Sequence, residues 1–151
     1  MSEHDLQTGL ITAINFVGGH ASNVESGLTS AGIPDVDYCV EGIVGHVEVK
    51  HYRKTKPLHL NAPDMKPSQV KWFRDRIKAG EMPMILSALK VDLGGRPTEC
   101  FVLHEGKYFE DLAKLKSTGE WLEFPNVSWW GEQPDWGMII RLLTRKELIL
   151  P

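Results

Sequence analysis

The stretch that decides the fold is "GIPDVDYCVEGIVGHVEVKHY", residues 32–52, because apolar and charged side chains alternate along it. A period of two predicts two β-strands, "DVDYCV" and "IVGHVEVKHY", joined by a hairpin turn within "EGIVG". One face of this hairpin is apolar and suits a core. The opposite face carries the charged side chains, which are Asp35, Asp37, Glu48 and Lys50.

Two registers of this hairpin are open. If Glu41-Gly42 forms a two-residue turn, residue 40 pairs with 43 and Asp35 lies opposite Glu48. If residues 41–44 form the loop, residue 40 pairs with 45, Asp35 faces Lys50 and Glu48 faces the other aspartate. Both registers gather the charged side chains on one face, whereas a three-residue loop would separate them. The plainer interpretation is a solvent-exposed hairpin face.

Opposed carboxylates on such a face point to metal chemistry. Two carboxylates about 5 Å apart repel each other unless a positive charge lies between them. Oxygen ligands suit Mg²⁺ or Mn²⁺, and no Cys/His cluster suggests zinc. A divalent cation lowers the pKa of its water and neutralises charge on phosphate oxygens, and Lys50 can hold an anionic oxygen. These parts are the ones that phosphodiester hydrolysis requires.

The remaining patterns predict a mixed α/β (α+β) domain with one central mixed sheet flanked by helices. Its length of 151 residues is typical of one domain. We expect a polar loop over 53–66. Apolar periodicity predicts helices over 5–16, 66–80, 110–116 and 136–150, and strands over 82–91 and 99–109.

Charge is unevenly distributed along the chain. The net charge is −3, yet residues 50–78 hold nine Lys/Arg and two Asp, a local balance of +7. This segment could hold a polyanion, or it could be a solvated helix face and a basic loop. The polar N-terminus and the lack of a long apolar run predict no secretory signal and no membrane span. We expect a cytoplasmic protein in which Cys39 and Cys100 are two buried thiols, rather than a disulfide or a metal-binding pair.

The pattern Pro34-Asp35 … Glu48-Val49-Lys50, followed by "SQVKWFRDRIKAG" at 68–80, resembles the PD-(D/E)XK nuclease superfamily. Within it, the chain is most similar to the VRR-NUC branch and to phage or Holliday-junction-resolvase-like nucleases. The resemblance covers roughly residues 3–90. It implies a restriction-endonuclease-like core in a single nuclease domain, 1–151, with the core over about 3–104 and a Trp-rich C-terminal extension over about 105–151.

The resemblance also implies roles for individual residues. Asp35 and Glu48 would be the metal-binding carboxylates, joined by the backbone carbonyl of Val49. Lys50 would be the catalytic lysine, and Gln69 would orient that lysine or the phosphate.

A further glutamate on the first helix completes the metal shell in this family. Glu3, at the start of the first predicted helix, is the favoured candidate, and Glu25, in a segment that does not look helical, is the alternative. A helix-start glutamate is also expected for its interaction with the helix dipole. Asp37 and His46 also lie on the charged face, where either could support the metal-binding residues from behind, although simple solvation is the favoured interpretation for both.

Basic residues after the catalytic strand are expected to contact phosphates without reading sequence. They are Arg53, Lys54, Lys56, Lys71, Arg74 and Lys78. The tryptophans of the C-terminal extension could stack on unpaired bases, although packing in a core or a subunit interface is the favoured interpretation.

The function implied by the resemblance is a divalent-metal-dependent endonuclease that hydrolyses DNA, with selectivity for branched or junction DNA. It implies a homodimer in a bacterial or phage-infected cell. One alternative is a catalytically inactive DNA-binding module that keeps the nuclease fold. Another is a hydrolase of a smaller phosphate ester, which would need less basic surface.

Overall fold

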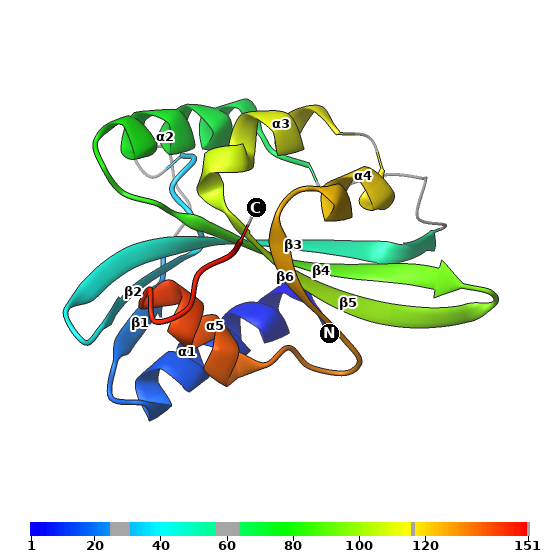
Figure 1. Ribbon diagram of the computed structural model, residues 1–151, viewed down its shortest axis with the longest axis horizontal. Helices are drawn as coiled ribbons and strands as arrows, with labels where there is room; N and C mark the ends of the chain where they lie inside the picture. Colours follow the sequence, from blue (N-terminus) through cyan, green and yellow to red (C-terminus); the bar gives the residue numbers. More distant parts are fainter. Residues whose placement is uncertain (25–30, 57–63, 116, 151) are drawn as a thin grey trace.

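A six-stranded mixed sheet forms the centre of the protein, and helices cover both of its faces (Figure 1). The computed structural model describes residues 1–24, 31–56, 64–115 and 117–150. The strands lie side by side in chain order, and β3 and β4 pair in parallel while the other neighbours are antiparallel. The strands are β1 His20–Asn23, β2 Val36–Val40, β3 Ile43–Lys56, β4 Met84–Leu93, β5 Arg96–Glu105 and β6 Asn126–Trp130.

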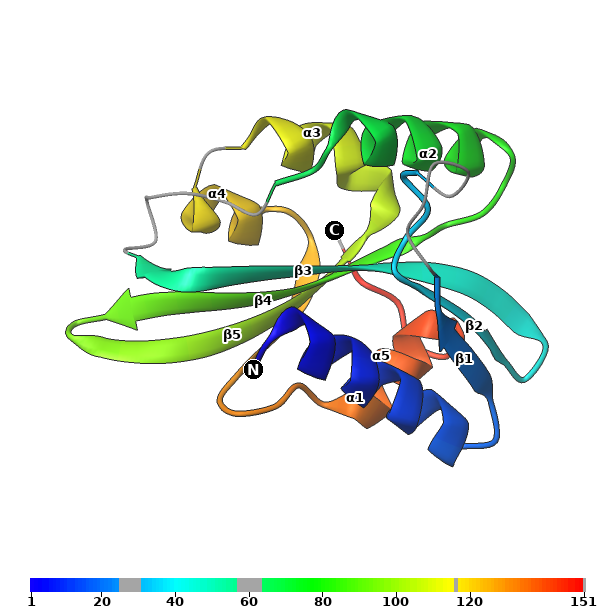
Figure 2. The same ribbon diagram turned by 180° about the vertical axis from the view of Figure 1, so that it is seen from behind.

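The helices form two layers around this sheet, as the opposite views in Figures 1 and 2 agree. One layer holds α1 Glu3–Phe16 and α5 Trp136–Leu143. The other holds α2 Pro67–Lys78, the short 3₁₀ helix η2 Gly106–Tyr108, α3 Phe109–Lys114 and α4 Thr118–Glu123. The mixed α/β class predicted from the sequence, with one central mixed sheet flanked by helices, is therefore confirmed.

The β2–β3 hairpin has the register of the two-residue turn. Val40 pairs with Ile43 and Val36 with Val47, which places Asp35 at the position facing Glu48. Both turn residues have positive φ, 52° at Glu41 and 79° at Gly42, as a type I′ turn requires. The four-residue alternative is therefore wrong. The polar loop expected over 53–66 is wrong at its start, because β3 continues to Lys56, where it still pairs with β4.

The two faces of the sheet build two different cores, and the hairpin contributes its apolar side chains to the first of them. Val36, Tyr38 and Val47 pack with the apolar faces of α1 and α5. The opposite sheet face packs against Phe73 of α2 and the fully buried Trp121 of α4. A parallel pair of strands needs a crossover connection, and the chain between β3 and β4 supplies it by placing α2 over this second face. The charged face of the hairpin is thus covered rather than open to solvent.

Residues after η2 complete the sheet and both helical layers. β6 pairs with β5 at the edge of the sheet, and α5 packs beside α1. Trp129 and Trp136 pack against the α1/α5 core, while Trp130 is 47% exposed. The tryptophans therefore serve mainly in packing. Strands β1 and β6 and helix α4 were not expected from the sequence, because each is only four to six residues long.

Both cysteines are free thiols, but only Cys100 is buried; the expectation that Cys39 is buried is wrong, because its side chain lies on the exposed side of β2. Within the described ranges, no helix combines the length and the apolar character needed to cross a bilayer.

His104 of β5 is a buried titratable side chain in the second core. It is fully buried, and its Nε2 atom lies 2.9 Å from the carbonyl oxygen of Trp121. Nε2–H therefore donates to this oxygen, and Nδ1 is left without a hydrogen-bond partner. Burial lowers the pKa of His104 to about 4, against the smaller opposing effect of the Trp121 hydrogen bond. Protonation would place an unpaired charge in the core.

We predict that His104 makes the protein less stable as the pH falls from about 6.5 to about 4. In this window the unfolded chain binds a proton that the folded chain does not, so the free energy of unfolding falls, by on the order of 2–3 kcal/mol. Urea unfolding at pH 7 and pH 4.5 measures the loss. In His104→Asn the amide can still donate to the Trp121 carbonyl oxygen but does not titrate, so its free energy of unfolding should fall less between pH 7 and pH 4.5. An equal fall in the variant and the unmodified protein would contradict the prediction.

Candidate active site

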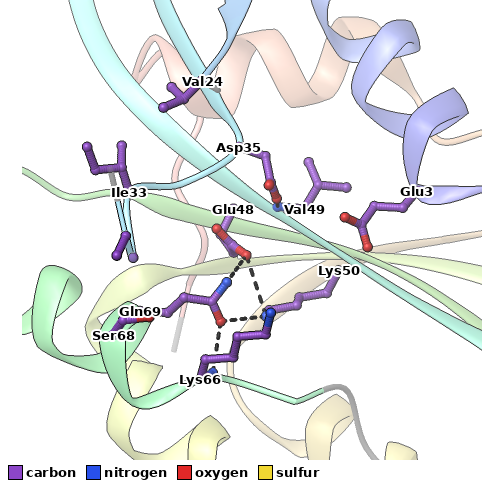
Figure 3. Close-up of a pocket in the computed structure, with 12 residues that line it drawn as sticks. Glu3, Val24, Ile33, Asp35, Glu48, Val49, Lys50, Lys66, Ser68 and Gln69 are labelled. Carbon is purple, nitrogen blue, oxygen red and sulfur yellow. Dashed lines mark hydrogen bonds and ion pairs between the residues drawn. The ribbon is translucent and has the colours of Figure 1, made fainter. Parts of the chain in front are cut away.

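A cleft of about 480 Å³ opens where the β2–β3 hairpin, the first residue of α1 and the start of α2 meet (Figure 3). The residues that the sequence analysis singled out for catalysis all line it. They are Glu3, Asp35, Glu48, Val49, Lys50 and Gln69. Residues from three separate elements therefore converge on one cavity.

The chain before β2 is fixed against α2 by a close backbone contact. Gly32 has φ +83°, and a Cβ atom at this position would collide with the carbonyl oxygen of Ser68. Only glycine fits both constraints. Three residues later, the Asp35 carboxylate accepts a hydrogen bond of 2.9 Å from the Val49 backbone N–H. The "GIPD" segment thus holds Asp35 next to β3.

Glu48 and Lys50 are buried beneath the start of α2, at 2% and 9% exposure. Gln69 links them (Figure 3): its Nε2 donates to Glu48 Oε1 at 2.6 Å, and its Oε1 accepts from Lys50 Nζ at 2.8 Å. Lys50 Nζ also lies 3.4 Å from Glu48 Oε1. A neutral amide therefore bridges a buried acid and a buried base, which lessens the cost of burying them.

The orientation of the Gln69 amide is set by the helix that carries it. Its Oε1 also accepts a hydrogen bond of 2.9 Å from the Lys66 backbone N–H, in the manner of a capping box. Pro67 at the first helical position fixes where the helix begins. With Oε1 held by two donors, Nε2 must face Glu48. The start of α2 thus positions the acid and the lysine of the hairpin.

The electrostatics of the cleft favour a bound positive charge. Burial, strengthened by the nearby charge of Asp35, raises the pKa of Glu48 to about 8. Burial also raises the pKa of Asp35, with the charge of Glu3 acting in the same direction and the Val49 N–H bond opposing it. Without a cation, Glu48 is largely protonated at neutral pH. A cation between the two carboxyl groups would stabilise their charged forms and so lower the pKa of each.

One oxygen of the Glu48 carboxyl group receives no hydrogen bond from the described residues. Oε1 is held by Gln69, whereas Oε2 is buried without a donor among them. A buried unpaired carboxylate oxygen is costly, and a hard cation is a suitable partner for it. Among the residues that the structure describes, no three or more His, Cys, Asp or Glu side chains form a ready metal cage. The donors therefore fit an ion such as Mg²⁺, which keeps several waters and binds one or two carboxylates.

Glu3 and Glu25 are placed differently. Glu3 lines the cleft from the start of α1 and points its carboxylate inward (Figure 3). Glu25 lies outside the described residues. Asp37 and His46, also on the charged hairpin face, do not line the cleft. The Asp37 carboxylate accepts a hydrogen bond of 2.7 Å from the Ser22 hydroxyl, and His46 Nδ1 lies 2.7 Å from Glu81 Oε1.

Of the basic residues expected to contact DNA, the three on α2 do not line the cleft. Lys71 pairs with Asp75 at 2.6 Å and Arg74 with Glu110 at 2.9 Å, both on the exposed surface of α2. Lys78, near the end of α2, is exposed and forms no ion pair with the described residues. The side chains of Arg53, Lys54 and Lys56 lie outside the described part of the structure, although their backbone belongs to β3.

Two residues at the start of α2 line the cleft without having been assigned a role from the sequence, Lys66 and Ser68. The signal that could have identified them is their position around Pro67, which marks the beginning of a helix that also carries Gln69. Sequence reasoning treated Lys66 only as part of the basic segment.

Comparison with known proteins gives little further guidance. No protein-family model matches the chain, and no curated protein matches it. A solved structure with some similarity is Archaeoglobus fulgidus Hjc, a Holliday junction resolvase from an archaeal hyperthermophile, with 20% sequence identity and a TM-score of 0.41. The match covers 69% of this chain and 77% of that chain. A likeness of this size assigns neither a family nor a function, so function has to be inferred from the cleft.

We predict that Gln69→Ala lowers the free energy of unfolding by about 2 kcal/mol, because the hydrogen bonds to Glu48 and Lys50 are lost together and both groups stay buried. Urea denaturation at pH 7 measures this change. Lys71→Ala, an exposed position on the same helix, is the control and should change stability by less than about 0.5 kcal/mol. Equal effects of the two substitutions would show that Gln69 does not hold the buried pair.

Proposed function

We propose that this protein is a divalent-metal-dependent nuclease that hydrolyses phosphodiester bonds in DNA. The observation that carries the proposal is the cleft in which Asp35 and Glu48 face each other beside Lys50, with Glu48 Oε2 buried and unpaired. Such an arrangement is costly for stability, and groups of this kind gather where binding or catalysis requires them. The PD…ExK pattern of the sequence supports the same activity.

In this proposal Asp35 and Glu48 hold Mg²⁺ or Mn²⁺ together with the backbone carbonyl of Val49, and Glu3 lines the same cleft from the start of α1. The bound cation supplies a more acidic water and a positive charge for the phosphate oxygens. Asp35 is kept in place by the Val49 N–H, and Glu48 by Gln69.

Lys50 has the clearest role among the protein's own groups. An ammonium carries three donors. One is used by Gln69 Oε1 at 2.8 Å, and a second faces Glu48 Oε1 at 3.4 Å. The third remains for an anionic oxygen of the substrate or for the attacking water. Because Lys50 is buried, its charge acts in a medium of low polarity and stabilises negative charge more strongly than a surface lysine would.

Further parts of the proposal concern the substrate and the assembly. Lys78 would contact the DNA backbone directly. Lys71 and Arg74 would do so after leaving their ion pairs with Asp75 and Glu110. The basic end of β3, Arg53, Lys54 and Lys56, would add further phosphate contacts. Branched or junction DNA is the proposed preferred form. A homodimer would supply a second active site for the second strand, and sedimentation at equilibrium tests this directly.

We expect Asp35→Ala and Lys50→Ala each to lower the rate of DNA cleavage by about a hundredfold or more, because each removes a group in contact with the reacting atoms. Asp35→Ala should also abolish Mn²⁺ binding, measured by titration calorimetry. Asp37→Ala is the matched control: this aspartate lies two residues after Asp35 but outside the cleft lining, so the variant should cleave as the unmodified protein does. Circular dichroism verifies that each variant is folded.

The form of DNA is tested by digesting linear duplex, single strand, flap and four-way junction side by side with Mg²⁺, Mn²⁺ or EDTA. The proposal requires cleavage with either metal ion and none with EDTA. Full activity of Asp35→Ala or Lys50→Ala would overturn the catalytic assignment. Tight DNA binding without cleavage in any metal would identify the inactive binding module instead.

A further inference from the structure

The cleft has walls of opposite charge. Glu3, Asp35 and Glu48 form one wall, from α1 and the hairpin. The opposite wall is the start of α2, where Lys66 and Ser68 face the same cavity (Figure 3). Without a cation, the first wall repels a phosphate group, whereas the second wall offers it positive charge and donors directly. The buried Glu48 Oε2, which receives no hydrogen bond from the described residues, marks the same cavity as the place where a ligand binds.

Lys66 is an available cation on this wall. Its side chain is exposed and forms no ion pair with the described residues, whereas Lys71 and Arg74 further along the helix are paired. Its backbone N–H is held by Gln69 Oε1 at 2.9 Å, which fixes the place from which the side chain starts. Lys66 is thus anchored beside the bridge to Lys50, while its ammonium remains free for a ligand.

Ser68 adds two donors at the same helix end. The first turn of a helix leaves N–H groups without intrahelical partners. Pro67 has no N–H, and Gln69 and Val70 both donate to the Lys66 carbonyl oxygen at 3.0 Å. Among the described residues no acceptor is found for the Ser68 N–H, and Ser68 is exposed, so its hydroxyl can donate as well. A free N–H, a hydroxyl and the positive end of the dipole of a 12-residue helix favour an anionic oxygen here.

We propose that Lys66 and Ser68 form a binding site for a backbone phosphate of the nucleic acid, beside the catalytic group. The inference rests on the proposed function and deepens it, since it assigns the substrate-holding wall of the cleft. Both are positioning residues: they hold the strand so that the scissile bond meets Lys50 and the carboxylates. Gly32 supports the site from outside, because its contact with the Ser68 carbonyl oxygen fixes the start of α2.

The first test measures binding of a fluorescently labelled DNA duplex in EDTA, by anisotropy over a range of salt concentrations. Lys66→Ala should weaken binding about tenfold at low salt and reduce the slope of log K against log salt by about one, as expected for one lost phosphate contact. Lys66→Arg should restore most of the affinity. Lys114→Ala, which removes an exposed charge from α3 outside the cleft lining, should bind as the unmodified protein does.

The second test uses Ser68→Glu. A glutamate in the first turn favours the helix dipole, so this variant should be as stable as the unmodified protein. It should nevertheless bind DNA at least tenfold more weakly, because it places a negative charge where the phosphate lies. Unchanged binding of both Lys66→Ala and Ser68→Glu would overturn the inference.

Cleavage kinetics with Mg²⁺ separate this inference from the proposed function. Lys66→Ala should raise KM several-fold with little change in kcat, as expected when ground-state and transition-state binding are lost equally. If the protein binds DNA in a Lys66-dependent manner but never cleaves it, the nuclease proposal fails and the phosphate site stands. If cleavage depends on Asp35 and Lys50 while Lys66→Ala has an unchanged KM, the phosphate site fails and the nuclease proposal stands.

Discussion

Burial of the Glu48 carboxyl group beneath α2 is the constraint around which the cleft is organised. The helix can close over the sheet only if the acid and the neighbouring Lys50 find partners, because unpaired buried charges cost several kcal/mol. Gln69 provides partners for both through one neutral amide, and the helix start holds that amide in one orientation. One carboxylate oxygen is still left unsatisfied. The protein thus keeps a local cost at the place where a cation and a substrate would be bound.

The two cores and the crossover between β3 and β4 hold the buried charged groups in place. The apolar side of the hairpin is buried under α1 and α5, and the opposite side of the sheet builds a second core with α2 and α4. The parallel pairing of β3 with β4 requires a crossover, and α2 lies on that connection, directly above the charged residues. The backbone contact between Gly32 and Ser68 then joins the segment before β2 to the helix. Rigid elements therefore hold every group that the proposed chemistry needs.

The separation of charge within the cleft connects the site to its proposed substrate. Carboxyl groups gather on the side of α1 and the hairpin, and the free cation and N–H donor lie at the start of α2. A divalent cation would lie against the carboxyl groups, and the phosphodiester would lie between that cation and the start of α2. The strongly basic segment seen in the sequence is partly neutralised in the folded protein, because Lys71 and Arg74 form ion pairs. Local charge counts alone therefore overstate the surface available to DNA.

The sequence by itself determined the hairpin and its charged face, since alternation and a type I′ turn are local properties of neighbouring residues. It also located α2 through Pro67 and the apolar period, and the resemblance to a nuclease family singled out Gln69 on that helix. Short elements such as β1, α4 and β6 escaped it, because few residues carry little periodic signal and their pairing decides them. Only the tertiary structure decided that the charged face is buried, that Gln69 bridges Glu48 and Lys50, and that Lys66 and Ser68 share their cleft. These are contacts between residues far apart in the chain, which arise when a helix packs on a sheet and which no local pattern contains.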